Sequence, residues 1–171
     1  RAMRAAFEAI EPGRTETEIA DAIAARFEAE GARPLFMIVG SGPNGAFPHH
    51  ATGDRKLAEG DAIVIDIGGR KDGFPSDMTR MAAVGHAPEG YADVHAVVER
   101  AVQAALAAAR PGVMAKSVDA AARDVIAQAG YGDFFVHRTG HGLGIEVHEP
   151  PYLTSVSETA LAEGMVLSIE P

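Results

Sequence analysis

The segment IVIDIGG, at residues 63–69, decides how this chain is read. Its β-branched residues predict a strand, and Asp66 lies inside that strand, where a role as a turn or cap residue fails. A second acid, Asp77, follows eleven residues later in SDMTR (76–80), beyond a glycine-containing stretch (69–73) that predicts a hairpin. The hairpin would bring Asp77 back beside Asp66. Because a carboxylate near a sheet core is unfavourable unless it is paired or metal-bound, the two acids predict a divalent metal site.

Two further candidate ligands occur later in the chain. His141 lies in RTGHGLG (138–144), and Glu170 lies in LSIEP (167–171) at the end of another strand-like run. Three carboxylates and one imidazole that converge on one place would repel one another unless a cation joined them. The set Asp66, Asp77, His141 and Glu170 therefore predicts a metal site, and a hydrolytic one is the sharper hypothesis.

His141 is one of three histidines in a short glycine-containing stretch, together with His137 and His148. The spacing of His137 and His141 matches the helical zinc motif H-E-x-x-H, but Arg138 replaces the glutamate and the flanking glycines disfavour a helix. On an extended chain these two histidines would lie on the same side. Any one of them could be a hydrogen-bonded structural histidine, whereas the three together predict the wall of a site.

The composition bounds the class of protein. The 171 residues are 47% hydrophobic and carry a formal charge of −9, which argues against nucleic acid or an anionic membrane as the main partner. No apolar run is long enough to span a bilayer. The absence of cysteine excludes disulfides and thiolate ligands and fits a cytoplasmic location. The chain starts at Arg1 and stops at Pro171 after a strand-like run, so we expect a fragment of a longer polypeptide.

Helical and strand patterns predict an α+β domain. The sequence TETE at 15–18 is typical of a capping box that begins the second helix. Helices are expected at about 2–10, 16–31, 88–109 and 117–129, and strands at about 35–40, 62–67, 78–84, 134–138 and 165–170.

The chain also repeats itself. RAMRAAFEAIEPG (1–13) matches RAVQAALAAARPG (100–112) at seven of thirteen positions, at an offset of 99 that also carries His49 onto His148. At an offset of 104, the strand that ends in Asp66 matches the run that ends in Glu170. Chance similarity between alanine-rich helices is the alternative. The equivalent histidines and acids favour two half-domains about a pseudo-twofold axis, with these groups facing a central cleft.

With this spacing of residues, the chain resembles the catalytic domain of the pita-bread metallopeptidases, which include methionine aminopeptidases, aminopeptidase P and prolidases. The family pattern of two aspartates, a histidine and a glutamate is met by Asp66, Asp77, His141 and Glu170. The family's fifth ligand, a second glutamate on a following strand, has no counterpart within residues 1–171. The resemblance implies two αβ halves with a curved antiparallel sheet covered by helices.

Several features resemble the Xaa-Pro branch of that family more than the methionine branch. They are His137 four residues before His141, the sequence DMTR at 77–80, and GSGPNG at 40–45 leading to His49, seventeen residues before Asp66. The resemblance implies that residues 1–171 form the catalytic domain and that an N-terminal domain lies upstream of Arg1.

The function implied by the resemblance is a two-metal exopeptidase that cleaves an N-terminal Xaa-Pro bond of dipeptides or peptides. His49 and His148 would be catalytic, with His148 also holding the substrate carbonyl and His137 lining the proline site. Manganese is the preferred ion because oxygen ligands dominate, with cobalt and zinc as alternatives. We expect a peptide substrate, weak activity of residues 1–171 alone, and a homodimer for the whole protein. The competing hypotheses are a methionine aminopeptidase-like enzyme and a non-catalytic pita-bread domain that binds a peptide or protein.

Overall fold

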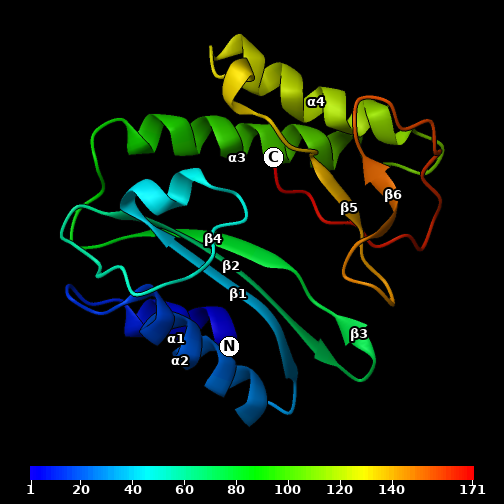
Figure 1. Cartoon of the computed structure of the whole chain (residues 1–171). Coiled ribbons are helices and arrows are strands. Elements are labelled where there is room, and N and C mark those ends of the chain that lie inside the picture. Colours follow the sequence, from blue (N-terminus) through cyan, green and yellow to red (C-terminus); the bar gives the residue numbers. More distant parts are fainter. The chain divides into compact units, whose positions relative to one another are not determined.

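The computed structural model describes residues 1–171 and divides them into two compact units, Arg1–Tyr91 and Ala92–Pro171 (Figure 1). Each unit combines helices with antiparallel strands, so the predicted α+β class is confirmed. A helix with both the length and the apolar character needed to cross a bilayer is not found in the structure.

The first unit opens with two helices, α1 (Ala2–Ala9) and α2 (Glu16–Ala29). The predicted capping box begins α2: the Glu18 amide donates to Thr15 Oγ1 at 3.1 Å, and the Thr15 amide donates to Glu18 Oε2 at 2.7 Å. These two bonds satisfy amides that a helix N-terminus would otherwise leave without partners. The start of α2 is therefore fixed by local sequence.

Four strands follow in this unit, together with the short 3-10 helix η1 (Gly42–Ala46). They are β1 (Arg33–Ser41), β2 (Ala62–Lys71), β3 (Phe74–Pro75) and β4 (Met78–Ala83). The long strand β2 pairs antiparallel with β1 along one edge and with β3 and β4 along the other. The strands predicted at 35–40, 62–67 and 78–84 are confirmed, and the first two extend further than expected.

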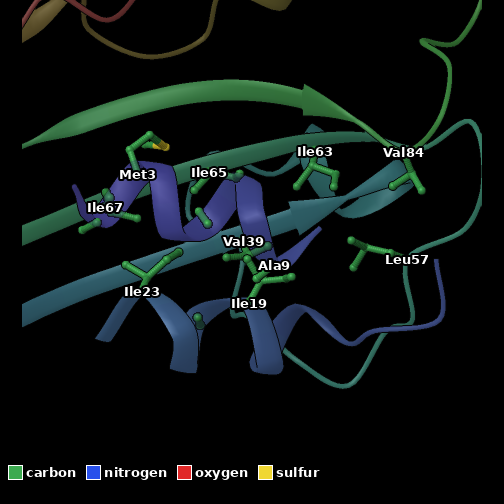
Figure 2. Packing of buried hydrophobic residues seen from close by; sticks show 13 residues of the cluster. Met3, Ala9, Ile19, Ile23, Val39, Leu57, Ile63, Ile65, Ile67 and Val84 are labelled. Atoms are coloured by element: carbon green, nitrogen blue, oxygen red, sulfur yellow. The ribbon is translucent and has the colours of Figure 1, made fainter. Parts of the chain in front are cut away.

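Strand β2 has one face in the hydrophobic core and one face outside it. Ile63, Ile65 and Ile67 are buried and pack with Ile19 and Ile23 of α2 (Figure 2). Because side chains alternate along a strand, Asp66 lies on the face opposite this core. Burying each isoleucine contributes about 1.5–3 kcal/mol, so the core fixes the register that keeps the carboxylate out of it.

The second unit contains α3 (Tyr91–Ala108), α4 (Ala115–Gln128), the 3-10 helix η2 (Gly132–Phe134) and the strands β5 (Gly140–Gly142) and β6 (Glu149–Leu153). α3 begins three residues later than predicted and α4 two residues earlier. The two strands form an antiparallel pair. Buried alanines of the two helices, Ala101, Ala105 and Ala122, pack with larger residues such as Val118 and Leu153 in the core of this unit.

The internal repeat is visible in the connection between the helices of each unit. In the first unit the Gly13 amide donates to the Leu57 carbonyl at 2.8 Å, and in the second the Gly112 amide donates to the Leu161 carbonyl at 2.7 Å. Both glycines have positive φ, 88° and 86°, which side chains other than glycine rarely adopt. Chance similarity of alanine-rich helices would not reproduce the same turn with the same long-range partner, so the repeat is structural.

The strand predicted at 134–138 is wrong. Phe134 closes the short helix η2, and the chain bends at His137. The Arg123 side chain donates to the Phe135 carbonyl at 2.9 Å and to the His137 carbonyl at 3.0 Å. Two carbonyls that a strand would use for its ladder are thus taken by a guanidinium from α4, which favours an irregular segment.

The strand predicted at 165–170 is also corrected, since this segment is irregular with one isolated bridge between Gly142 and Leu167. It nevertheless bonds to the chain around β5. The Ser168 amide donates to the His141 carbonyl and the Glu170 amide to the Thr139 carbonyl, each at 2.8 Å. These bonds place Glu170 within reach of His141.

Candidate functional site

Asp66 occupies the middle of the most extensively paired strand of the first unit. It lies opposite Ile38 on β1 and Thr79 on β4. Thr79 Oγ1 donates to Asp66 Oδ1 at 2.9 Å, across the strand pair. The carboxylate is half-buried and is held in one orientation by a neighbour that was not among the predicted site residues.

Asp77 reaches the same face of the sheet through the predicted hairpin. Lys71 pairs directly with Phe74, so the turn consists of Asp72 and Gly73, a dipeptide that favours two-residue hairpins. Asp77 immediately precedes β4, two residues before Thr79. Because Thr79 lies opposite Asp66, alternation along an extended chain puts Asp77 on the face of Asp66, diagonally displaced. The expected juxtaposition of the two acids is therefore a consequence of the observed register.

His141 is buried on β5, between two glycines that the packing requires. A Cβ at Gly140 would collide with the Ser168 carbonyl, and a Cβ at Gly142 would lie 2.6 Å from the Pro150 carbonyl oxygen. The backbone of His141 is hydrogen-bonded at both its amide and its carbonyl. The amide donates to Ser168 Oγ at 3.0 Å, and the carbonyl accepts the Ser168 amide at 2.8 Å. The two glycines therefore permit the close approach of residues 149–150 and 168 to this strand.

The His141 ring has two different partners. Nδ1 lies 2.9 Å from the Gly142 carbonyl oxygen, which can only accept, so this partner assigns the hydrogen to Nδ1. Nε2 lies 3.0 Å from Glu170 Oε1. A neutral ring with its hydrogen on Nδ1 directs a lone pair at the carboxylate, and that arrangement is repulsive unless a proton or a metal ion lies there. The nitrogen lone pair of His141 Nε2 and the carboxylate oxygen Glu170 Oε1 are both chemically suited to bind a divalent cation.

Glu170 is held as an anion by its surroundings. Burial raises the pKa of its carboxyl, but a protonated His141 ring, which donates from Nε2 and carries positive charge, and the hydrogen bond from Ser168 outweigh burial, and the pKa is lowered overall from its ordinary value. Ser168 Oγ donates to Glu170 Oε1 at 2.8 Å. The same oxygen thus faces both the hydroxyl and the imidazole, so its position relative to His141 is well defined.

The other two histidines of this segment are exposed. The His148 ring lies with its centroid 4.3 Å from that of His141, in an edge-on arrangement. His137 Nδ1 lies 2.7 Å from the Arg138 carbonyl oxygen, and its ring contacts the buried Phe135 edge-on at 5.1 Å between centroids. His137 and His141 were expected on the same side of an extended chain. Because the chain bends at His137, the two histidines do not share a strand face.

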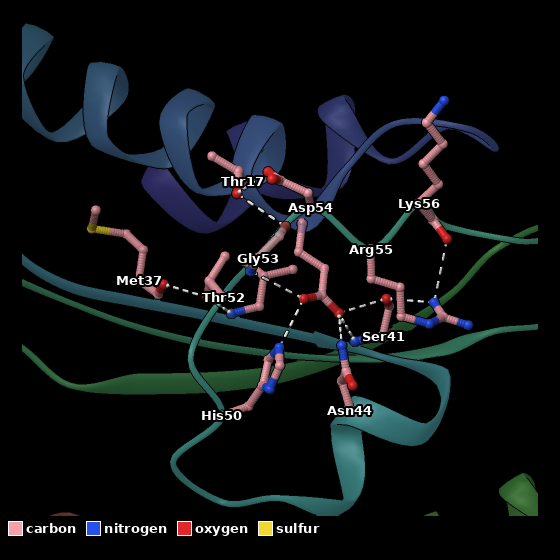
Figure 3. A network of polar contacts seen from close by, with 12 residues as sticks. Thr17, Met37, Ser41, Asn44, His50, Thr52, Gly53, Asp54, Arg55 and Lys56 are labelled. Carbon is pink, nitrogen blue, oxygen red and sulfur yellow. Dashed lines mark hydrogen bonds and ion pairs between the residues drawn. The ribbon is translucent and has the colours of Figure 1, made fainter.

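His49 is exposed in the loop that follows η1, and it is the next residue, His50, that contacts a buried acid. Glu16, in the first turn of α2, has a fully buried side chain whose Oε2 lies 2.8 Å from His50 Nε2 (Figure 3). Its Oε1 accepts the Ser41 amide at 2.8 Å and Ser41 Oγ at 2.7 Å. Burial raises the pKa of the Glu16 carboxyl, but hydrogen bonds from Ser41, Asn44 and His50 outweigh it and lower the pKa to about 2.

The second unit contains a comparable buried acid, Asp119 of α4. Its Oδ1 accepts the Thr139 hydroxyl at 2.8 Å and the Thr139 amide at 3.3 Å. Arg123 pairs with both oxygens of the carboxylate, each at 3.0 Å, and its guanidinium lies 4.0 Å from the centre of the Phe135 ring. Thr139 precedes His141 by two residues, so this network fixes the approach to β5.

Sequence reasoning missed Glu16 and Asp119 for a common reason. Both carboxylates lie on helices whose other acidic residues are solvent-exposed or cap the helix, and acidic side chains are rarely fully buried. One signal was present: Glu16 and Asp119 stand on the faces of α2 and α4 that also carry the buried Ile19 and Val118.

The comparisons with known proteins agree with this architecture. The solved prolidase from Pyrococcus furiosus matches 98% of the chain with a TM-score of 0.96 at 40% identity, covering 50% of that protein. Aminopeptidase P from Escherichia coli matches 98% of the chain with a TM-score of 0.88 at 28% identity, covering 43% of that protein. The chain therefore has the α+β pita-bread fold of these enzymes.

The family follows from the sequence comparison. The model of metallopeptidase family M24 matches residues 1–171, and the chain belongs to that family. A probable dipeptidase, PepE, of Mycobacterium tuberculosis is 51% identical over 94% of this chain and 43% of its own length. The Xaa-Pro dipeptidase of Pyrococcus furiosus is 40% identical over 100% of this chain and 50% of its own length. The chain thus spans about half the length of the curated relatives it matches.

The buried Glu16 carboxylate generates a prediction for acid stability. Its pKa in the folded state, about 2, is below the ordinary value of 4.5, so its contribution is present above about pH 4.5 and is lost as the pH falls towards 2. We expect Glu16→Gln to lower the free energy of unfolding by about 3 kcal/mol at pH 7 and by much less near pH 3. Urea unfolding of both proteins across this range measures the difference. A difference that does not change with pH would contradict the assignment.

Proposed function

We propose that the whole protein is a two-metal exopeptidase that hydrolyses the N-terminal Xaa-Pro bond of dipeptides or peptides, and that residues 1–171 contribute its catalytic domain. The observation that carries the proposal is the pairing of His141 Nε2 with Glu170 Oε1 while Nδ1 is committed to a carbonyl. Membership of a metallopeptidase family and relatives named Xaa-Pro dipeptidase support the reaction class.

Asp66, Asp77, His141 and Glu170 are the residues that would hold the ions. Carboxylates and one imidazole suit divalent cations of intermediate hardness, and the excess of oxygen donors favours manganese over cobalt or zinc. When bound, such ions would supply the Lewis acid that lowers the pKa of water and stabilises the developing oxyanion. The peptide carbonyl and the attacking water would then need to be oriented by groups of the protein.

The exposed histidines are proposed to act on the substrate. His49 would donate a proton near the scissile peptide, and His148, beside the His141 ring, would hold the substrate carbonyl. His137, packed on Phe135, would line the position of the proline ring. Their exposure supports these roles, because a group that meets substrate must be reachable from solvent.

The metal assignment is tested by removing one ligand from each unit. In the whole protein, Asp66→Ala and Glu170→Ala should each lower metal content and abolish hydrolysis, because each change unbalances the ionic cluster. Elemental analysis and turnover of an Xaa-Pro dipeptide are the measurements, with the exposed Asp21→Ala and Glu163→Ala as matched controls. Folded variants that lose metal and keep full turnover would refute the hydrolytic role. A wild-type protein that neither binds metal nor hydrolyses peptides would favour a non-catalytic binding domain.

The histidine roles give a different signature. His49→Ala and His148→Ala should lower kcat by about 10²–10⁴-fold, the usual contribution of acid–base groups, while metal content stays near that of the wild type. The exposed His86→Ala serves as the control for loss of a surface imidazole. Metal loss as large as that of the Asp66 variant would show that these histidines are ligands instead.

The substrate preference separates the two branches of the family. Proline in second position gives a tertiary amide without N–H, so a site built for it requires an apolar wall rather than an acceptor for that hydrogen. We expect kcat/KM for Xaa-Pro dipeptides or peptides that begin Xaa-Pro to exceed kcat/KM for Met-Ala-Ser when manganese is supplied. A tenfold preference for Met-Ala-Ser, about 1.4 kcal/mol in the transition state, would assign the protein to the methionine branch.

A further inference from the structure

We propose that Glu16 is a positioning residue for the loop of residues 42–53, which carries His49. The proposal rests on the proposed function for its effect on turnover, whereas its effect on the loop follows from the geometry alone. Glu16 lies on α2, outside that loop, and its carboxylate is fully buried. Its action on His49 would be indirect, through the backbone on either side of this residue.

The two carboxylate oxygens of Glu16 bind the loop at both ends and between them. Oε1 accepts from Ser41, directly before the loop, and from Asn44 Nδ2 at 3.0 Å within η1. Oε2 faces His50 Nε2 at 2.8 Å and accepts the Gly53 amide at 3.3 Å (Figure 3). One side chain thus joins points that are up to twelve residues apart in the sequence, from Ser41 to Gly53.

The repeat shows that packing of the helix does not require an acid at this position. At the offset of 99, Glu16 corresponds to Ala115, which is the first residue of α4 and is equally buried. A buried carboxylate is unfavourable unless donors surround it, so an acid where the equivalent unit has alanine indicates a task beyond filling space. Asp119, the buried acid of the second unit, contacts Thr139 and Arg123 instead.

The position of His49 in the loop makes the consequence specific. Its neighbour His50 is tied to Glu16 through the ring and to Phe47 through its amide, which donates to the Phe47 carbonyl at 3.1 Å. The His49 side chain is exposed, but the backbone that presents it is fixed from both sides. Releasing the carboxylate would leave the imidazole present and accessible but no longer held in one place.

The experiment compares Glu16→Gln with Glu28→Gln in the whole protein. Both changes replace an acid of α2 by its amide, but Glu28 is exposed, so it controls for the loss of charge on this helix. In Glu16→Gln, the nitrogen of the new side-chain amide cannot accept the hydrogen bond that the Gly53 amide donates. Amide hydrogen exchange of residues 42–53 should become at least about tenfold faster in Glu16→Gln at short exchange times, before the amides of β2 and β4 that exchange through global unfolding are labelled. In Glu28→Gln the exchange of residues 42–53 should remain at the wild-type rate.

Turnover then tests the link to His49. Glu16→Gln should lower kcat by about 10- to 100-fold with metal content unchanged, the order expected when a reacting group is misplaced. In a His49→Ala background the same change should have almost no further effect, because the group that it positions is gone. An equal fold-loss in both backgrounds, or loop exchange that does not change, would overturn the proposal.

Two further measurements keep the test decisive. If Glu16→Gln does not fold, Asn44→Ala removes one contact of the network and should give a smaller change of the same kind, with faster loop exchange and lower kcat. Unchanged exchange in that variant would overturn the proposal as well. If His49→Ala leaves kcat unaltered, the role proposed for His49 fails, while the exchange data still decide whether Glu16 holds the loop.

Discussion

A carboxylate withdrawn from water must be surrounded by hydrogen-bond donors, and each unit of this protein contains one such carboxylate on a helix. Glu16 and Asp119 are fully buried, and each accepts both the amide and the hydroxyl of one residue, Ser41 and Thr139 respectively. These partners are 25 and 20 residues away along the chain. Sliding either helix along its partner segment would leave a buried charge without donors, which costs several kcal/mol, so the two bonds fix the relative position of helix and strand end.

The constraint is shared by the two units, but the surroundings that satisfy it differ. Glu16 is surrounded by donors from a loop and lies against one imidazole, without an arginine among its hydrogen-bond partners. Asp119 is paired with Arg123, whose remaining N–H groups bind two carbonyls and thereby bend the segment that leads to Thr139. The repeated helices α2 and α4 therefore carry different polar networks. The network of Glu16 holds the loop that carries His49, and the network of Asp119 holds the segment that precedes His141.

The parts of the fold that follow from local sequence could be predicted, while those that depend on distant partners could not. The capping box, the turn glycines and the Asp66–Asp77 hairpin each involve residues close together in the chain, and the pleat then determines which face the acids share. The strand expected at 134–138 failed because Arg123, more than ten residues earlier, takes its carbonyls. The buried role of Glu16 could not be predicted, since its partners come from a loop whose path the sequence pattern does not define.

The proposed site residues divide according to burial, and the division has a physical basis. His49, His137 and His148 are exposed and are the groups proposed to meet substrate, whereas His141 is buried beside Glu170. The Gly142 carbonyl sets the tautomer of the buried ring, so the direction of its Nε2 lone pair is fixed by the protein itself. If this ring is a ligand as proposed, it needs no reorientation when an ion binds, and only the contact between Nε2 and Glu170 has to be exchanged. A ligand side chain that is already ordered loses less conformational entropy when an ion binds. This is why the buried His141 suits the role of ligand, while the exposed histidines suit contact with the substrate.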